Sequence, residues 1–276
     1  VGARIIDGHG GQPIPDGVVV IKGNLIEQVG SRDAVTIPKD AEVIKGDGLS
    51  VLPGFIDAHF HLDGMAGLPA TFLQHGVTSL RDPGAWIDSY AGERTSKQPI
   101  PRLFLCGPHL DMNPPAYPND ALVVRDSSEA EQAVNKNIDE GASAIKAYFR
   151  LPPDLIRVIC NTAHRRGIPV MAHLEITEAM AAIDAGLDGV EHITSFGLSL
   201  QSRHDGEKYR QLVLSDNDAR KQGRYEVWKT IDVNSKQADS LCAFLVRKGT
   251  FVSPTLGPFE YQSGKDSTDS TKLIGF

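Results

Sequence analysis

The fold class is decided by the stretch EGASAIKAYFRLPPDLIRVICNTAHRRGIPVMAH, residues 140–173. A glycine at its start can end a helix, because glycine adopts the left-handed backbone found there at little cost. A short apolar strand (143–148) follows, and then a segment (152–167) whose first residues are prolines, which suit the first turn of a helix. A second glycine leads into another apolar strand (168–173). Strand, helix and strand at this spacing indicate a parallel sheet.

The same pattern recurs along most of the chain. Each of five glycines is followed within two or three residues by an apolar run, at Gly76, Gly141, Gly167, Gly186 and Gly249. A helix is also predicted over 127–141, with Ser128 as its N-cap. The pattern predicts seven strands, near 55–61, 77–81, 103–107, 143–148, 168–173, 188–193 and 250–255.

These strands predict an α/β protein, a (β/α)8 barrel of the TIM type with seven of its eight strands visible. Residues 53–276 would form this barrel, and its eighth strand would lie beyond the chain end, on a second segment of a longer protein. Residues 1–52 do not show this alternation of strands and helices. The run VVVIKGNLIEQVG (18–30) predicts two strands around a Gly23-Asn24 turn, so we expect a small N-terminal β-sandwich portion.

A long insertion at 194–234 separates the last two predicted strands. It is rich in Arg, Lys, Asp and Gln and shows no strand pattern. Long loops of this kind often carry specificity, so the insertion is interpreted either as a lid or as a solvated helix pair.

Composition excludes several classes of protein. With 41% hydrophobic residues in 276, the chain is not mainly disordered. A net charge of −7 argues against a nucleic-acid partner. No apolar run approaches the roughly 18–20 residues of a membrane helix. Three scattered cysteines suggest neither disulfides nor a zinc ribbon, and we expect a cytoplasmic protein.

Metal-binding side chains recur where the predicted strands end. His59 and His61 end the first strand, Lys146 lies late in the fourth, and two further histidines, His173 and His192, end the fifth and sixth. Barrel active sites assemble at this edge, and residues i and i+2 of a strand share a face. Burying the Lys146 ammonium alone would be costly. The sequence therefore predicts a metal site, with Asp57 as a supporting carboxylate.

The sequence resembles the amidohydrolase superfamily, and most of all its imidazolonepropionase-like and Xaa-Pro dipeptidase (prolidase)-like members. The resemblance rests on VLPGFIDAHFHL (51–62), AIKAYF (144–149), VMAHLEI (170–176) and GVEHITSFG (189–197). It implies a binuclear centre in which His59 and His61 bind one metal and His173 and His192 bind the second. Lys146, carbamylated by CO2, would bridge them. The family's last ligand, an aspartate at the end of the eighth strand, has no counterpart in this chain.

The implied reaction is hydrolysis of a C–N bond in an amide, a dipeptide or a cyclic amide, by a metal-bound hydroxide. Histidine and oxygen ligands suit Zn2+ first. The same centre could instead hydrolyse phosphotriesters, carbamates or ureas. A non-catalytic relative that keeps the fold for binding or assembly is the third possibility. We expect a small-molecule substrate and a homo-oligomer.

Three residues are candidates for contact with the substrate. Tyr148 lies on the same strand face as Lys146 and either contacts the substrate or packs against the insertion. Arg150 either clamps a substrate carboxylate or is a solvated loop residue. His109 either lines the mouth of the barrel or is an ordinary loop histidine.

Overall fold

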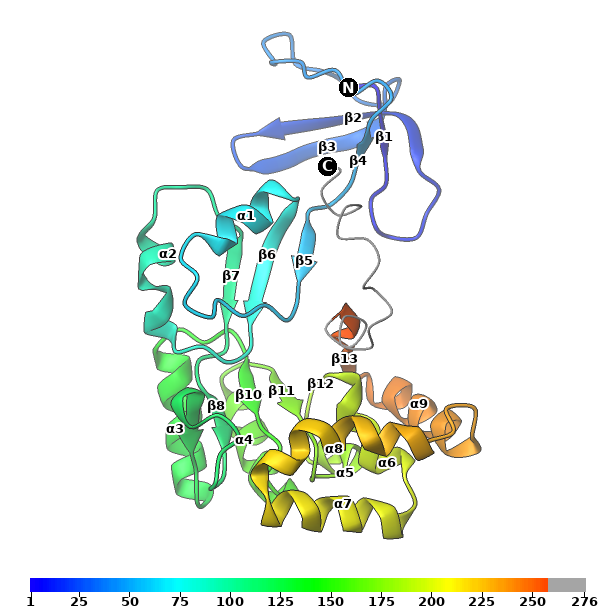
Figure 1. Ribbon diagram of the computed structural model, residues 1–276. Coiled ribbons are helices and arrows are strands. Elements are labelled where there is room, and N and C mark those ends of the chain that lie inside the picture. The colour runs from blue at the N-terminus through cyan, green and yellow to red at the C-terminus, as the bar shows by residue number, and fades with distance from the viewer. Residues whose placement is uncertain (258–276) are drawn as a thin grey trace. The chain divides into compact units, whose positions relative to one another are not determined.

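The computed structural model describes residues 1–257 and divides into two compact units (Figure 1). Residues Val1–Phe55 form the first unit, and the second begins at Ile56. Each unit is described by itself.

The first unit is a four-stranded mixed sheet with strand order β3-β2-β1-β4. Its strands are β1 (Ala3–Ile5), β2 (Ile14–Lys22), β3 (Leu25–Ser31) and β4 (Ser50–Val51). β2 and β3 form the predicted antiparallel hairpin, and Gly23 turns the chain at a φ of 62°. β1 runs antiparallel to β2 and parallel to β4. The expected sandwich portion is therefore seen as one sheet, without a second layer among the described residues of this unit.

The second unit contains two sheets. A three-stranded sheet has the order β5-β6-β7, and a six-stranded parallel sheet has the order β13-β12-β11-β10-β8-β9. The strands of the first are β5 (Phe55–Asp57), β6 (Val77–Asp82) and β7 (Arg102–Leu105). Those of the second are β8 (His109–Asp111), β9 (Ala121–Val123), β10 (Ile145–Ala147), β11 (Val170–His173), β12 (Gly189–Glu191) and β13 (Phe251–Ser253).

One interrupted stretch, from β7 to β8, joins the two sheets. Gly107 breaks it with a φ of 73°. On one side Cys106 N donates to Asp82 O at 3.0 Å, and on the other Ser143 N donates to Leu105 O at 2.7 Å. The two sheets are thus connected through this stretch, and the strand predicted near 103–107 corresponds to β7.

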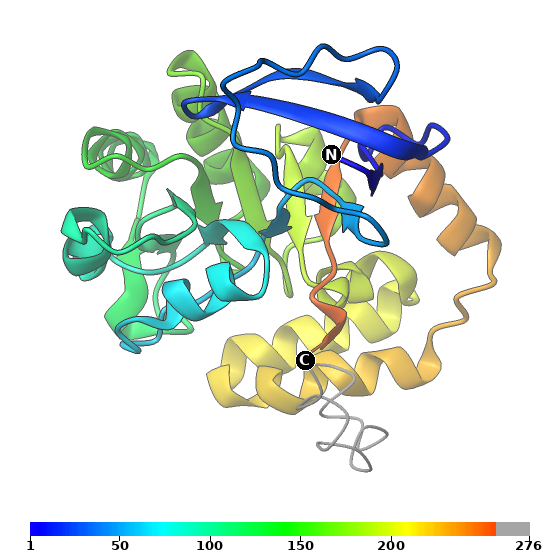
Figure 2. The same cartoon turned by 90° about the horizontal axis from the view of Figure 1, so that it is seen from above.

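Helices pack on the outer side of the parallel strands (Figure 2). The main ones are α3 (Ser127–Asp139), α4 (Pro153–Arg165), α5 (Ala179–Asp184) and α9 (Lys236–Lys248). All five glycines of the recurring pattern have positive φ, as predicted. The predicted cap at Ser128 is wrong. Asp126 caps α3 by accepting from Glu129 N, because a carboxylate one residue before the helix reaches that N–H.

The remaining helices and 3-10 turns complete the described chain. They are α1 (Leu68–Gln74), η1 (Ile87–Tyr90), α2 (Ala91–Thr95), η2 (Pro118–Asp120), η3 (Ile193–Phe196), α6 (Gly197–Leu200), α7 (Arg203–Ser215), η4 (Asn217–Ala219), α8 (Arg220–Glu226) and η5 (Val227–Thr230). The insertion between β12 and β13 is therefore helical. No helix in residues 1–257 has both the length and the apolar character to cross a membrane.

All seven predicted strands are observed, and the α/β class with a parallel sheet is confirmed. Closure into a barrel is not seen, since β5 and β13 do not pair with each other in the part of the chain described. The eighth strand stays a prediction.

The crowding at Gly189 in β12 can be tested. A Cβ there would lie 2.6 Å from Met171 Sδ and 3.1 Å from Phe251 O. Because both neighbours belong to adjacent strands, we expect Gly189→Ala to lower the free energy of unfolding by about 1–3 kcal/mol in urea denaturation. Gly92→Ala is the matched control, since its Cβ would meet nothing within 4 Å. Equal stability of the Gly189→Ala protein and the wild type would contradict this packing.

Candidate metal centre

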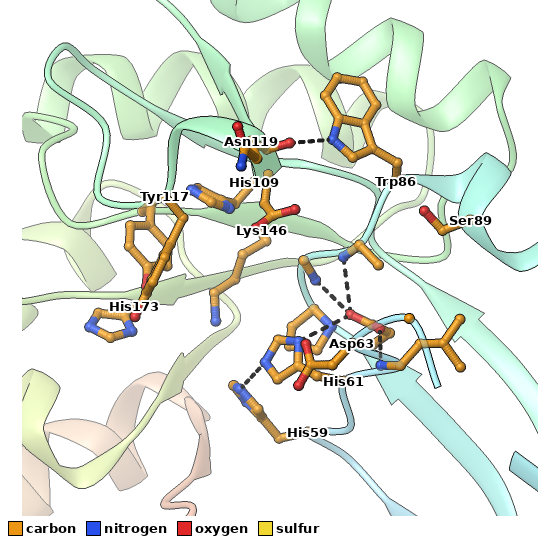
Figure 3. A pocket seen from close by; sticks show the side chains of 18 of the residues that line it. His59, His61, Asp63, Trp86, Ser89, His109, Tyr117, Asn119, Lys146 and His173 are labelled. Carbon is orange, nitrogen blue, oxygen red and sulfur yellow. Dashed lines mark hydrogen bonds and ion pairs between the residues drawn. The ribbon is translucent and has the colours of Figure 1, made fainter. Parts of the chain in front are cut away.

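The five predicted metal-binding side chains line one cavity of about 940 Å³ (Figure 3). They come from the ends of four strands of the second unit, as the sequence predicts: His59, His61, Lys146, His173 and His192. The imidazole rings form a connected group, with centroids 5.1 Å apart for His59 and His61, and 4.6 Å apart for both His59–His192 and His173–His192. In residues 1–257, no three His, Cys, Asp or Glu side chains are already arranged as a complete metal site.

His59 and His61 face each other through their Nε2 atoms, which lie 3.3 Å apart. Their Nδ1 atoms are each near a buried carboxylate. His59 Nδ1 lies 2.7 Å from Glu191 Oε2, and His61 Nδ1 lies 3.5 Å from Asp82 Oδ1. Since an ionised carboxylate only accepts hydrogen bonds, Nδ1 carries the proton in each neutral ring. Two lone pairs therefore point at each other from the facing Nε2 atoms.

This pair fits a metal cation. Two nitrogens bound at about 2.0–2.1 Å to one tetrahedral ion would lie about 3.3–3.4 Å apart, which is close to the separation found. A carboxylate on the second ring nitrogen is the usual support of a metal-binding histidine, because it fixes the tautomer and the ring orientation. Asp57, the support expected from the sequence, instead accepts from His59 N at 3.0 Å and so holds the backbone of that turn.

Lys146 is buried, with 2% of its surface exposed, and in the described residues its Nζ has no hydrogen-bond partner. The nearest charge is Glu191 Oε1, 4.0 Å away. Burial lowers the pKa of Lys146 to about 8, while Glu191 opposes that shift. The amine is therefore partly neutral near physiological pH. A neutral amine beside four imidazoles is suited to reaction with CO2 or to contact with a metal-bound group.

His173 and His192 also have one nitrogen engaged. His173 Nε2 lies 2.7 Å from Glu175 Oε1, and His192 Nδ1 lies 2.7 Å from Thr255 Oγ1. The opposite nitrogens are those available for a metal. His192 has a φ of 62°, which is strained for a residue with a Cβ, and its N–H is held by Ser253 O at 2.8 Å.

Burial favours the neutral form of three of these imidazoles. It lowers the pKa of His59, His173 and His192, and for His59 the contact with Glu191 only partly opposes the effect. Neutral imidazole is the form that binds metal ions. The site therefore holds these three candidate ligands in the protonation state that a metal requires.

Glu191 connects most of this site. Its carboxylate is fully buried and contacts His59 through Oε2 and Arg81 through Oε1, at 2.6 Å for the arginine. Burial alone would raise its pKa, but Lys146, His59 and Arg81 lower it well below the usual range. Glu191 is thus an ionised carboxylate that lies between the partly buried Arg81 and the buried Lys146.

Two of the three predicted substrate-binding residues line the cavity, His109 and Tyr148. Their rings lie 4.3 Å apart, and the Tyr148 ring lies 4.6 Å from that of His173. His109 is 3% exposed, and its Nε2 has no hydrogen-bond partner among the described residues. Burial lowers the pKa of His109 to about 3 and raises that of Tyr148. Both side chains are therefore neutral.

Arg150 is placed elsewhere. It does not line the cavity, and its NH2 donates to Val213 O at 3.2 Å and to Asn217 Oδ1 at 2.7 Å. The guanidinium instead ties the chain after β10 to the end of α7. We therefore do not retain Arg150 as a substrate clamp.

Several polar residues of the site were not predicted as such from the sequence. Glu191 and Glu175 lie beside predicted ligands, and an acidic residue inside an apolar strand is the signal that could have identified Glu191. Asp82 supports the site by contacting His61 and by accepting from Tyr90 Oη at 2.6 Å. Arg224 lies on α8, where no sequence pattern connects it to the cavity.

The family model of the amidohydrolase family matches residues 50–207, more than half of the chain. The chain belongs to the amidohydrolase family. The resemblance found in the sequence is thereby confirmed, and the match includes all five candidate metal-binding residues, which precede residue 207.

The individual proteins that this chain resembles carry different names. An uncharacterized protein of Mycobacterium tuberculosis is 26% identical over 62% of this chain and 53% of its own, and an adenine deaminase of Listeria monocytogenes is 36% identical over 33% of this chain and 15% of its own. The chain thus spans about half the length of the first of these relatives. Among solved structures, a prolidase complexed with N-methylphosphonate-L-proline has a TM-score of 0.60 at 21% identity, covering 92% of this chain and 77% of the prolidase.

The role of Glu191 can be tested without activity. Glu191→Gln keeps the shape but removes the charge that balances Arg81 and Lys146, so we expect the free energy of unfolding to fall by about 2–4 kcal/mol. Glu140→Gln is the matched control, because the pair of Glu140 with Lys136 is exposed and should change stability by less than about 0.5 kcal/mol. If both variants unfold at the wild-type denaturant concentration, Glu191 does not balance these cations.

Proposed function

We propose that this chain carries the metal centre of a hydrolase that cleaves a C–N bond in an amide, dipeptide or cyclic amide. The observation that carries the proposal is the facing Nε2 pair of His59 and His61, 3.3 Å apart, with both Nδ1 atoms near buried carboxylates. Membership of the amidohydrolase family supports it.

In this proposal two divalent metals, with Zn2+ as the first candidate, occupy the cavity. His59 and His61 would hold one and His173 and His192 the other, and Lys146, as a carbamate, would supply a shared anionic ligand. The unpaired Nζ of Lys146 supports this role, because carbamylation turns a buried cation into an anion. Bound there, the metals would supply an activated water and polarise the scissile carbonyl.

In this proposal, other polar residues of the cavity orient the metal ligands and the substrate. Glu191 and Asp82 hold the rings of His59 and His61 in place. His109 lines the cavity, and among residues 1–257 its buried Nε2 has no hydrogen-bond partner. Tyr148 stays protonated, so its hydroxyl can donate to a substrate oxygen. A prolidase among the similar structures supports an N-acyl amino acid or dipeptide as the substrate.

The ligand set gives the first test of this proposal. Purified protein should contain about two metal ions per chain by mass spectrometry. It should hydrolyse at least one substrate in a screen of N-acyl amino acids and Xaa-Pro dipeptides, supplied with Zn2+ and bicarbonate. His59→Ala and His61→Ala should each lose at least one metal and lower kcat by about 10³-fold or more, since the attacking water is no longer activated.

His9→Ala is the control, because His9 is exposed and lies in the first unit. Wild-type metal content in the His59→Ala protein would contradict the assignment. A protein that binds no metal at all would favour the non-catalytic alternative. Turnover of phosphotriesters but of no amide would favour the alternative chemistry.

Lys146 gives an independent test. Protein equilibrated with ¹³C-bicarbonate and Zn2+ should show a carbamate signal by ¹³C NMR, because its lowered pKa leaves part of the amine neutral. Lys146→Met should lose this signal while remaining folded, and Lys136→Met, at an exposed residue, should keep it. A carbamate signal that persists in Lys146→Met would refute the bridge.

A further inference from the structure

Lysine and arginine side chains are scarce in the cavity wall. Among the described residues that line it, only Lys146 and Arg224 belong to these two types. Lys146 lies at the buried floor, beside the candidate metal ligands. Arg224 lies on α8 of the insertion, a wall that the metal ligands do not occupy. It is therefore the arginine that an incoming substrate can meet.

Arg224 has donors that the protein leaves unused. Its NH2 donates to Tyr225 Oη at 3.0 Å, and its NH1 lies 3.8 Å from Glu175 Oε1, beyond hydrogen-bond distance. Its Nε is buried and has no hydrogen-bond partner among the described residues. The side chain is 21% exposed. Because Nε is buried, an anion in the cavity would be bound by the terminal NH1 and NH2 groups, whose two N–H bonds can be parallel.

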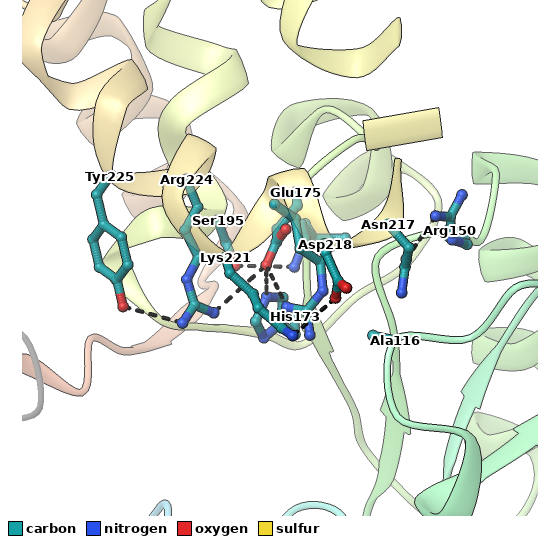
Figure 4. Close-up of polar contacts among 12 residues, drawn as sticks. Ala116, Arg150, His173, Glu175, Ser195, Asn217, Asp218, Lys221, Arg224 and Tyr225 are labelled. Carbon is teal, nitrogen blue, oxygen red and sulfur yellow. Dashed lines mark hydrogen bonds and ion pairs between the residues drawn. The ribbon is translucent and has the colours of Figure 1, made fainter. Parts of the chain in front are cut away.

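The insertion holds Arg224 in a fixed position. Arg220, one turn earlier on α8, is 1% exposed and its NH1 donates to Glu175 Oε1 at 3.4 Å. Figure 4 shows the contact of the same carboxylate with Arg224. The Arg220 guanidinium also lies over the Tyr117 ring, 4.9 Å from its centroid. Arg150 anchors the preceding turn through Asn217. Because α8 is tied down on both sides of the cavity wall, binding to Arg224 requires little ordering of the side chain.

The charges around Arg224 do not cancel. Glu175 is one carboxylate shared by two guanidinium groups, those of Arg220 and Arg224. Asp218 and Lys221 on the same segment pair with each other at 2.8 Å, so they leave the balance unchanged. The two guanidinium groups together carry one more positive charge than Glu175 balances. An anionic group on the substrate would neutralise this excess charge at the cavity wall.

The geometry points to Arg224 as the residue that selects substrates with a carboxylate, which it binds while the amide lies at the metal centre. This inference rests on the proposed function and names its substrate class: N-acyl amino acids and dipeptides rather than neutral or cyclic amides. Glu175 acts as a positioning residue, since it links Arg224 and Arg220 to His173. The clamp that the sequence suggests at Arg150 is thereby assigned to a different arginine.

Binding of a matched pair of probes tests this inference without requiring turnover. N-acetyl-L-leucine and N-acetyl-L-leucinamide differ only in carboxylate against carboxamide. By calorimetry, the purified metal-containing wild type should bind the acid more tightly than the amide by about 100-fold, as expected for a charge pair in a partly buried site. Arg224→Ala should bind the two alike, and Arg224→Lys should recover part of the preference.

Lys221→Ala is the matched control, because it removes the same charge from the same helix, and Lys221 does not line the cavity. Its preference for the acid should equal that of the wild type. Equal binding of both probes by the wild type, absence of binding included, would overturn the inference. So would a preference that survives in Arg224→Ala.

Kinetics separates this inference from the proposed function. If amides are hydrolysed, Arg224→Ala should raise KM for the acid more than KM for the carboxamide, since only the acid presents a carboxylate to Arg224, and Lys221→Ala should leave kcat for both within about threefold. His59→Ala should abolish turnover of both. A protein that prefers the acid in binding but hydrolyses neither probe would refute the proposed reaction while leaving the role of Arg224 supported.

Discussion

The buried carboxylate of Glu191 is the interaction on which the candidate site depends. It lies between His59, Arg81 and Lys146, and its side chain is fully buried. An ion in such a place is tolerated only when opposite charges surround it closely. The contact also fixes the proton of His59 on Nδ1, which turns Nε2 toward His61. Glu191 thus balances the positive charge of Arg81 and Lys146 and orients the candidate ligand His59.

The same arrangement occurs at three of the four histidines. Glu191 lies behind His59, Asp82 behind His61, and Glu175 behind His173. Each carboxylate is in turn held by another group: Arg81 for Glu191, Tyr90 for Asp82, and Arg220 for Glu175. Neutral imidazoles rotate easily, and a carboxylate on one nitrogen removes that freedom. The ligands are therefore oriented by the protein before any metal binds, which lowers the cost of metal binding.

Glu175 extends this arrangement into the insertion. Its contacts with Arg220 and Arg224 connect the candidate metal ligand His173 to a segment that sequence patterns describe only as helical and charged. The arginine proposed to select the substrate and a proposed metal ligand therefore share one buried carboxylate. Such sharing gives a physical reason for the insertion to stay docked, since undocking would take both guanidinium groups away from the buried charge of Glu175.

The sequence by itself determined the features that follow from local chemistry. Glycines at helix ends, strand spacing and the positions of His59, His61, Lys146, His173 and His192 at strand ends are all readable along the chain, because each depends on residues within a few positions of it. The helix cap at Asp126 was missed, since Asp126 and Ser128 compete for the same role and only the backbone selects one. Only the tertiary structure decided the partners of the buried charges. Glu191 lies far in sequence from His59 and Arg81, and Arg224 far from Glu175. Such pairs form where burial makes an unpaired charge costly, and that burial exists only once the sheets and the insertion have packed together.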